Sequence, residues 1–196
     1  ESNPIHYISA SLKDNNLKFY RFTTKNGKSN FYDQDGKSSK KTLMKTPLNG
    51  ARLSSGFGNR KHPILGFTKM HRGIDFAAPI GTPIFAAGDG VIEYSGWNGA
   101  YGKYIRIRHN GTFKTAYAHL SKIYKKRGTR IKQGDIIGTL GSTGRSTGPH
   151  LHYEILIGGS QVNPLQIKLP SSKNIPKNEL DSFYKKQENI NSKIYA

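Results

Sequence analysis

The chain has 196 residues, enough for one domain of ordinary size with an extension and a buried core. It contains no cysteine, which excludes disulfide bonds and cysteine-ligated zinc. Its formal net charge of +19 favours a polyanionic partner, but the lysines are scattered along the chain and no nucleic-acid-binding motif accompanies them. We therefore expect no nucleic-acid partner.

Residues 1–49 are predicted to form a small β extension, which can belong to a larger upstream domain. Asn26-Gly27 is a strong hairpin turn signal between two apolar stretches. The strand-like segments are 5–12, 17–24 and 30–32. The first residue is Glu1 rather than Met, so we expect a trimmed chain. Membrane anchoring is then expected only through a segment upstream of it.

Residues 50–170 are predicted to form an all-β unit, because short strands follow one another with no helix-length pattern among them. The predicted strands are 83–87, 90–95, 104–109, 114–120, 135–140 and 151–157. Two stretches, GDGVIEYSG and KQGDIIGTLG, share a Gly-Asp-then-apolar order that indicates a duplicated β motif. Strands this dense favour an antiparallel arrangement.

Residues 171–196 are predicted to form a linker and an amphipathic helix over 177–191. Pro176 suits a first helical turn, and Leu180, Phe183 and Tyr184 keep helical spacing on one face. This apolar stripe needs a surface to cover, either the sheet or the N-terminal extension. A helix that binds a separate partner is the less common alternative.

The stretch 141–154, GSTGRSTGPHLHYE, carries two histidines in a strand pattern. Side chains two residues apart share a face of a strand, so His150 and His152 are expected to point into the same space. Taken alone, such a pair is more often packed or exposed than functional.

A second motif, HRGID, places His71 and Asp75 four residues apart in a segment whose Gly73 favours an extended conformation. A hydrolytic zinc site takes three His, Asp or Glu ligands and leaves one position open. His71, Asp75 and His152 are the predicted ligands. His119, in the strand-like AYAHL, and His150 then lie beside the metal as candidate acid–base groups. HExxH is absent, so this pair replaces the usual glutamate base.

The motifs HRGIDFAAPIGTPIFAAGDG, YAHL and GSTGRSTGPHLHYE resemble those of the lysostaphin/LytM-type zinc metallo-endopeptidases of peptidoglycan. Within that family the chain is most similar to Gram-negative MepM-like murein DD-endopeptidases. The resemblance implies an open antiparallel sheet with a groove, one Zn²⁺ per chain held by His71, Asp75 and His152, and His119 with His150 as the catalytic pair.

The resemblance also implies hydrolysis of the D-alanyl–meso-diaminopimelate cross-link in the periplasm or cell envelope of a Gram-negative bacterium, with possible inner-membrane anchoring. A monomer is expected, with peptidoglycan as substrate and envelope adaptor proteins as further partners. Arg145, in the glycine-rich loop, is a candidate for binding a substrate carboxylate. His62, near HRGID, is a second substrate-binding candidate. The alternative is a non-enzymatic relative that binds peptidoglycan or activates amidases, which typically lacks zinc ligands.

Overall fold

The structure is a computed structural model that describes residues 4–12, 15–61, 68–170 and 173–194. The chain divides into two compact units, residues 1–42 with 169–196 and residues 43–168. The boundaries predicted after residues 49 and 170 stay predictions; the compact units divide a few residues earlier. The C-terminal helix belongs to the same unit as the N-terminal strands.

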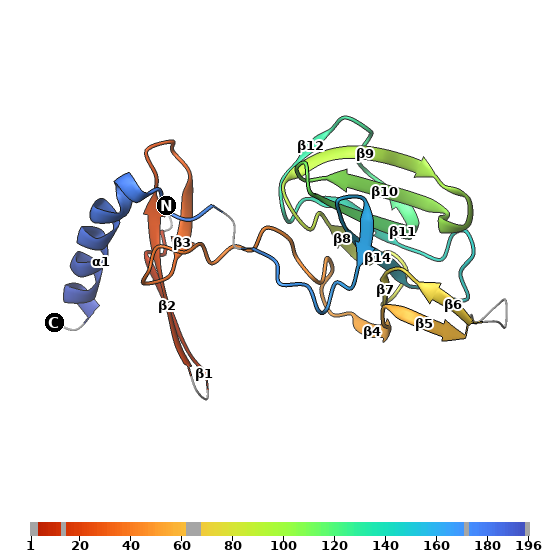
Figure 1. Ribbon diagram of the computed structural model, residues 1–196, viewed down its shortest axis with the longest axis horizontal. Helices are drawn as coiled ribbons and strands as arrows, with labels where there is room; N and C mark the ends of the chain where they lie inside the picture. The colour runs from red at the N-terminus through yellow and green to blue at the C-terminus, as the bar shows by residue number, and fades with distance from the viewer. Residues whose placement is uncertain (1–3, 13–14, 62–67, 171–172, 195–196) are drawn as a thin grey trace. The chain divides into compact units, whose positions relative to one another are not determined.

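The first unit is a three-stranded antiparallel sheet covered by a helix (Figure 1). Its strands, in the order β1-β2-β3, are β1 (Tyr7–Leu12), β2 (Asn15–Thr23) and β3 (Ser29–Tyr32). A single 3₁₀ turn, η2 (Lys177–Glu179), leads into α1 (Leu180–Ile194). The predicted helix is therefore present, and its regular α part begins and ends three residues later than the sequence indicates.

An aromatic cluster joins α1 to this sheet. Phe183 of α1 is fully buried and meets the rings of Tyr20, Phe22 and Tyr32 edge-on, with centroid distances of 5.6 to 6.3 Å. The Tyr20 hydroxyl donates to Asn191 Oδ1 at 3.0 Å. The apolar stripe of the helix thus covers the N-terminal strands. Among the described residues, no helix is both long and apolar enough to span a membrane.

The second unit is built on a ten-stranded antiparallel sheet with a separate two-stranded hairpin, as an all-β prediction requires. Its main path runs β12-β9-β10-β11-β14-β7-β4 (Figure 1). The strands are β4 (Arg52–Ser55), β5 (Gly58–Lys61), β6 (Thr68–His71), β7 (Ile74–Ala77), β8 (Pro83–Phe85), β9 (Gly90–Trp97), β10 (Lys103–Arg108), β11 (Phe113–Ile123), β12 (Arg130–Ile131), β13 (Ile136–Leu140), β14 (Leu151–Ile157) and β15 (Ser160–Val162), with a 3₁₀ turn η1 (Gly99–Tyr101).

The central strands are buried on both faces, and the two faces differ in chemistry. Tyr117 of β11 and Tyr153 of β14 are directly opposite each other, fully buried, with ring centroids 5.4 Å apart. On the other face, Ala118 lies opposite His152 and Ala116 lies opposite Glu154. Because side chains alternate along a strand, one face holds the large core residues and the other carries small and polar groups. The polar face holds the candidate site.

Candidate metal centre

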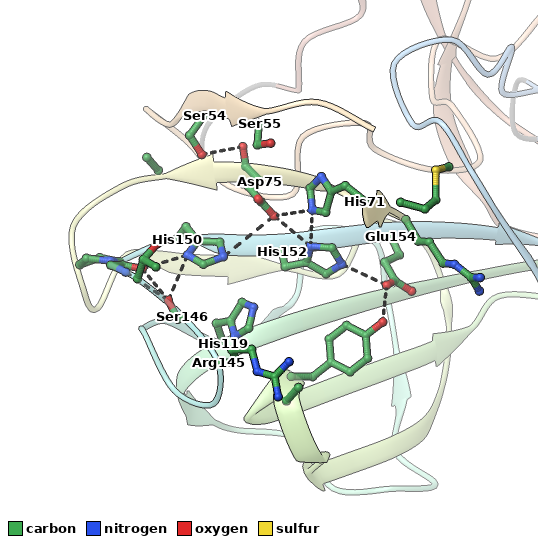
Figure 2. A pocket seen from close by; sticks show the side chains of 18 of the residues that line it. Ser54, Ser55, His71, Asp75, His119, Arg145, Ser146, His150, His152 and Glu154 are labelled. Atoms are coloured by element: carbon green, nitrogen blue, oxygen red, sulfur yellow. Dashed lines mark hydrogen bonds and ion pairs between the residues drawn. The ribbon is translucent and has the colours of Figure 1, made fainter. Parts of the chain in front are cut away.

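An open pocket of about 770 Å³ lies over this polar face (Figure 2). Its lining comes from β4, β6, β7, β11, β14 and β15, from the glycine-rich loop before β14 and from η1. The four predicted histidines and the predicted aspartate all line it: His71, Asp75, His119, His150 and His152. The structure thus gathers into one pocket residues that are up to 81 positions apart in the chain.

Three of these side chains converge on one point. His71 ends β6, Asp75 lies in β7, and the cross-strand partner of Asp75 is His152 in β14. Asp75 Oδ1 lies 3.1 Å from His71 Nε2 and 2.9 Å from His152 Nδ1. The two ring nitrogens are 3.0 Å apart. These are the three ligands that the two motifs predict, and their donor atoms lie within 4.8 Å of one another.

The second nitrogen of each ring fixes which atom faces the cluster. His71 Nδ1 donates to the Gly56 carbonyl oxygen at 2.7 Å, and His152 Nε2 donates to Glu154 Oε1 at 3.0 Å. In a neutral imidazole only one nitrogen carries the proton, so both facing nitrogens hold lone pairs. Two lone pairs and a carboxylate oxygen would then face one another with no hydrogen between them. This donor set fits a divalent metal ion, and zinc accepts both imidazole nitrogen and carboxylate oxygen as ligands.

Without a metal ion, protons on the ring nitrogens would take its place between the rings and Asp75. Burial acts to raise the pKa of Asp75, but hydrogen bonds from His152 and His71 outweigh it and hold the pKa well below its usual range. Burial acts to lower the pKa of His152, but contacts with Asp75 and Glu154 outweigh it and raise the pKa to about 9. The cluster therefore requires positive charge at its centre, supplied by a proton or by a metal ion.

His119 reaches the pocket through an irregular backbone. It has a φ of 62°, which is the left-handed region, and is the one non-glycine residue with positive φ among those described. The register of β10 with β11 shifts between Ile105 and Lys103, beside this residue. Such bulges re-aim side chains next to functional sites. The His119 ring consequently lies 4.6 Å, centroid to centroid, from that of His150.

Both non-ligand histidines have their Nδ1 atoms engaged by carbonyl groups. His119 Nδ1 donates to the Thr143 carbonyl at 2.8 Å, and His150 Nδ1 donates to the Gly148 carbonyl at 2.9 Å. Each Nε2 is left as the basic nitrogen, and that of His150 lies 4.0 Å from Asp75 Oδ1. Burial lowers the pKa of His119 to about 4, and the Thr143 hydrogen bond only partly opposes this. His119 is therefore neutral near pH 7.

The glycine of HRGID is required by close packing. A Cβ on Gly73 would lie 2.7 Å from His152 Cε1 and 2.7 Å from the Tyr153 carbonyl oxygen. The bend between β6 and β7 therefore passes directly against the ring of His152. The predicted extended conformation holds for His71 and Asp75, but they belong to two strands separated by this bend.

Of the two predicted substrate-binding residues, the structure describes Arg145 but not His62. Arg145 is exposed and lines the pocket, and its backbone N–H donates to the Ala100 carbonyl at 2.8 Å. Arg72, which the motif analysis did not single out, also lines the pocket and is exposed. Neither guanidinium group has a hydrogen-bond or ion-pair partner in the described part of the chain. His62 lies outside the described residues.

Glu154 and Tyr101 form a polar contact in the pocket that the motif analysis did not include. Glu154 is 2% exposed and accepts hydrogen bonds from His152 Nε2 and, at 2.9 Å, from the Tyr101 hydroxyl (Figure 2). Burial acts to raise the pKa of Glu154, but the hydrogen bond from His152 outweighs it and lowers the pKa. The alternation of HLHYE places Glu154 on the same strand face as His152, so its position beside His152 could have been predicted from the strand pattern. The contribution of Tyr101, which lies on a distant turn, could not.

Comparison with known proteins identifies the family of the chain. Residues 69–164 match the family model described as Peptidase family M23. Peptidoglycan DD-endopeptidase ShyC of Vibrio cholerae is 49% identical over 155 residues, which are 79% of this chain and 36% of that protein. The chain thus spans about a third of the length of this curated relative.

Two solved structures extend the comparison. A zinc-containing peptidase from Vibrio cholerae is 37% identical, with a TM-score of 0.63 over 85% of this chain and 51% of that one. The catalytic domain of lysostaphin from Staphylococcus simulans is 38% identical, with a TM-score of 0.56 over 60% of this chain and 92% of that domain. The fold and the motifs therefore agree, and this chain belongs to peptidase family M23.

Proposed function

We propose that the chain is a zinc-dependent endopeptidase that hydrolyses peptide cross-links of peptidoglycan during cell-wall growth or remodelling. The observation that carries this proposal is the convergence of three lone-pair atoms beside two further histidines in one open pocket. The names of relatives support the substrate, since ShyC and ShyA of Vibrio cholerae are both called peptidoglycan DD-endopeptidases.

One zinc ion per chain would be held by His71 Nε2, Asp75 Oδ1 and His152 Nδ1. When bound, zinc supplies Lewis acidity that polarises a carbonyl group and lowers the pKa of water. The protein's part is to direct the ligand atoms. Gly56 and Glu154 accept hydrogen bonds from the other ring nitrogens, and the two strands keep Asp75 opposite His152.

His119 and His150 would carry out the two proton transfers that peptide hydrolysis needs. Cleavage of an amide requires a group that takes a proton from water and a group that gives one to the leaving amine. Both histidines hold a proton on Nδ1, bound to a backbone carbonyl, and keep Nε2 as the basic atom. Either can serve in either step, since their rings lie side by side.

The proposed bond is D-alanyl–meso-diaminopimelate, which carries a free carboxylate beside the amide nitrogen. Two pocket carboxylates, Asp75 and Glu154, are engaged by histidines, whereas the guanidinium groups of Arg72 and Arg145 have no such partner among the described residues. A guanidinium binds a carboxylate with two parallel hydrogen bonds. The pocket therefore favours substrates with anionic groups near the cleaved bond. His62 stays a candidate for the same role.

The cellular setting belongs to the same proposal. The protein would act in the periplasm or cell envelope of a Gram-negative bacterium, where adaptor proteins would direct it. The protein would act as a monomer. The relatives named as DD-endopeptidases support this setting.

Digestion of purified, cross-linked peptidoglycan tests the proposal, with mass analysis of the products. Each cleavage should release one stem peptide with a new D-alanine carboxylate and one with a new free diaminopimelate amine. His71→Ala should lose zinc and cleavage together, because one of three ligands is removed. Stoichiometric zinc retained in His71→Ala would contradict the ligand set. Zinc-loaded wild-type protein that leaves the cross-links intact would favour the non-enzymatic alternative, a peptidoglycan-binding or amidase-activating relative.

A further inference from the structure

Glu154 contacts the proposed metal centre from behind one of its ligands. It lies on β14 two residues after His152, on the same face of the strand, and it is 2% exposed. Its Oε1 accepts a hydrogen bond from His152 Nε2 at 3.0 Å. A neutral imidazole holds a single ring proton, so this bond leaves Nδ1 of His152 with its lone pair toward Asp75.

Two other elements hold the Glu154 carboxylate in place. The Tyr101 hydroxyl, from η1, donates to the same Oε1 at 2.9 Å. Gln161 Nε2, from β15, donates to Oε2 at 3.4 Å. The Tyr101 ring also packs beside the ring of His152, with centroids 5.7 Å apart. The carboxylate is therefore fixed from three directions, and the His152 ring is held by both a hydrogen bond and a packed aromatic face.

Charge balance connects Glu154 to a metal ion. Among the described residues, its ion-pair partner is His152, and no lysine or arginine contacts it. A buried carboxylate is unfavourable unless a positive charge compensates it. A divalent metal ion and the Asp75 carboxylate together carry a net charge of +1. The Glu154 carboxylate, which contacts the centre through the ring of His152, brings the net charge to zero. Both imidazoles can then stay neutral.

We propose that Glu154 is a positioning residue of the metal centre, and that Tyr101 fixes it there. It selects the tautomer of His152, sets the ring direction and supplies the balancing charge. The proposal rests on the proposed zinc function. Carboxylates behind a metal-bound histidine act in this way generally, and their loss weakens metal binding by about 10–100-fold.

Glu154→Gln is the primary test, because the amide keeps the size of the side chain and removes the charge. The control is Glu93→Gln, the same change on β9 of the same sheet, where the carboxylate pairs with Arg106 and Lys114 at 2.7 and 2.8 Å. Zinc affinity is measured by competition with a chromophoric chelator. We expect about 10–100-fold weaker binding for Glu154→Gln and no more than about twofold for the control.

A second variant and a spectroscopic measurement separate positioning from simple destabilisation. Tyr101→Phe keeps the ring and removes only the hydroxyl, so it should weaken zinc binding in the same direction but less. With Co²⁺ in place of zinc, the visible bands of Glu154→Gln should shift relative to wild type, because the basicity of the His152 ligand changes. Those of Glu93→Gln should not.

The outcomes are distinct. Wild-type zinc affinity in Glu154→Gln, with unchanged cobalt bands, overturns this inference and leaves the proposed function intact. Wild-type protein that binds no zinc overturns the proposed function itself. If Glu154→Gln does not fold, Tyr101→Phe decides: unchanged zinc affinity in that variant overturns the inference, and weakened affinity supports it.

Discussion

His119 and His150 differ from the three clustered residues in how their side chains are held. Both are anchored through Nδ1 to backbone carbonyls of one loop, at Thr143 and Gly148, so the loop positions the pair as a unit. The cluster of His71, Asp75 and His152 is instead linked through mutual contacts. This division predicts that either histidine of the pair can be removed without loss of the metal.

His119→Ala and His150→Ala should each keep zinc and the fold, and each should lose turnover by at least about 100-fold, the usual scale for an acid–base group. Because both would act in one reaction, the double variant should be little worse than the poorer single one. Zinc content, melting temperature and cross-link cleavage are measured on the same preparations. A single variant that retains zinc and cleaves at nearly the wild-type rate would show that its histidine is only structural.

The lowered pKa of His119 predicts a pH-dependent loss of stability. Its pKa is about 4 in the folded protein and about 6.5 when the chain unfolds. Between these values the unfolded chain binds a proton that the folded one does not, so stability falls as the pH falls. Protonation of this residue in the unfolded chain should lower the free energy of unfolding at pH 5 by about 2 kcal/mol relative to pH 7. His119→Gln should therefore lose less stability than the wild type between pH 7 and pH 5. Denaturant titrations of both proteins at the same zinc content measure this. An equal loss in both proteins would contradict the pKa assignment.

Individual site residues were predictable where the signal is local. The HxH alternation and the four-residue spacing of HRGID identify all three clustered residues. The left-handed backbone of His119 was not predictable, since it arises from a register shift against β10. The contact of Tyr101 with Glu154 was not predictable either, because Tyr101 belongs to none of the motifs that indicate the site.

Secondary-structure elements were easier to predict than their pairing. Apolar spacing indicated the helix that became α1, and turn signals separated most strands of the sheet. The order β11-β14-β7 depends on which strands bury each other's side chains, and a single sequence does not specify this. That order is what places Asp75 opposite His152. The metal centre is therefore a product of sheet topology as much as of its motifs.

The packing of α1 predicts a localised effect for Phe183→Ala. Phe183 is fully buried among three aromatic rings. Truncating such a side chain to alanine typically lowers the free energy of unfolding by about 3–5 kcal/mol. The loss should appear as reduced hydrogen-exchange protection of β2 and α1. Tyr184→Ala, at a neighbouring position that is 38% exposed, serves as the control and should have little effect. Undiminished protection of β2 in Phe183→Ala would contradict the assigned core.

At the scale of the whole molecule, the two compact units differ in which residues they hold. Residues 43–168 hold the ten-stranded sheet and every residue of the metal cluster. Residues 1–42 and 169–196 share an aromatic core but come from opposite ends of the chain. An N-terminal extension was predictable from its turn signals. Its union with the C-terminal helix was not, because an amphipathic stripe does not specify which apolar surface it covers.

This arrangement predicts different results for two truncations. Removing residues 1–42 alone should expose Phe183 and Ile175, both buried in the shared core, and cause aggregation. Removing residues 169–196 as well should leave 43–168 soluble and able to bind zinc, since it keeps the whole sheet. Size-exclusion chromatography, zinc content and cleavage of peptidoglycan are compared with the full chain. Faster cleavage by 43–168 would mean that the removed residues restrict the pocket. A soluble 43–196 with the wild-type melting temperature, or a 43–168 unable to bind zinc, would contradict the division of roles between the units.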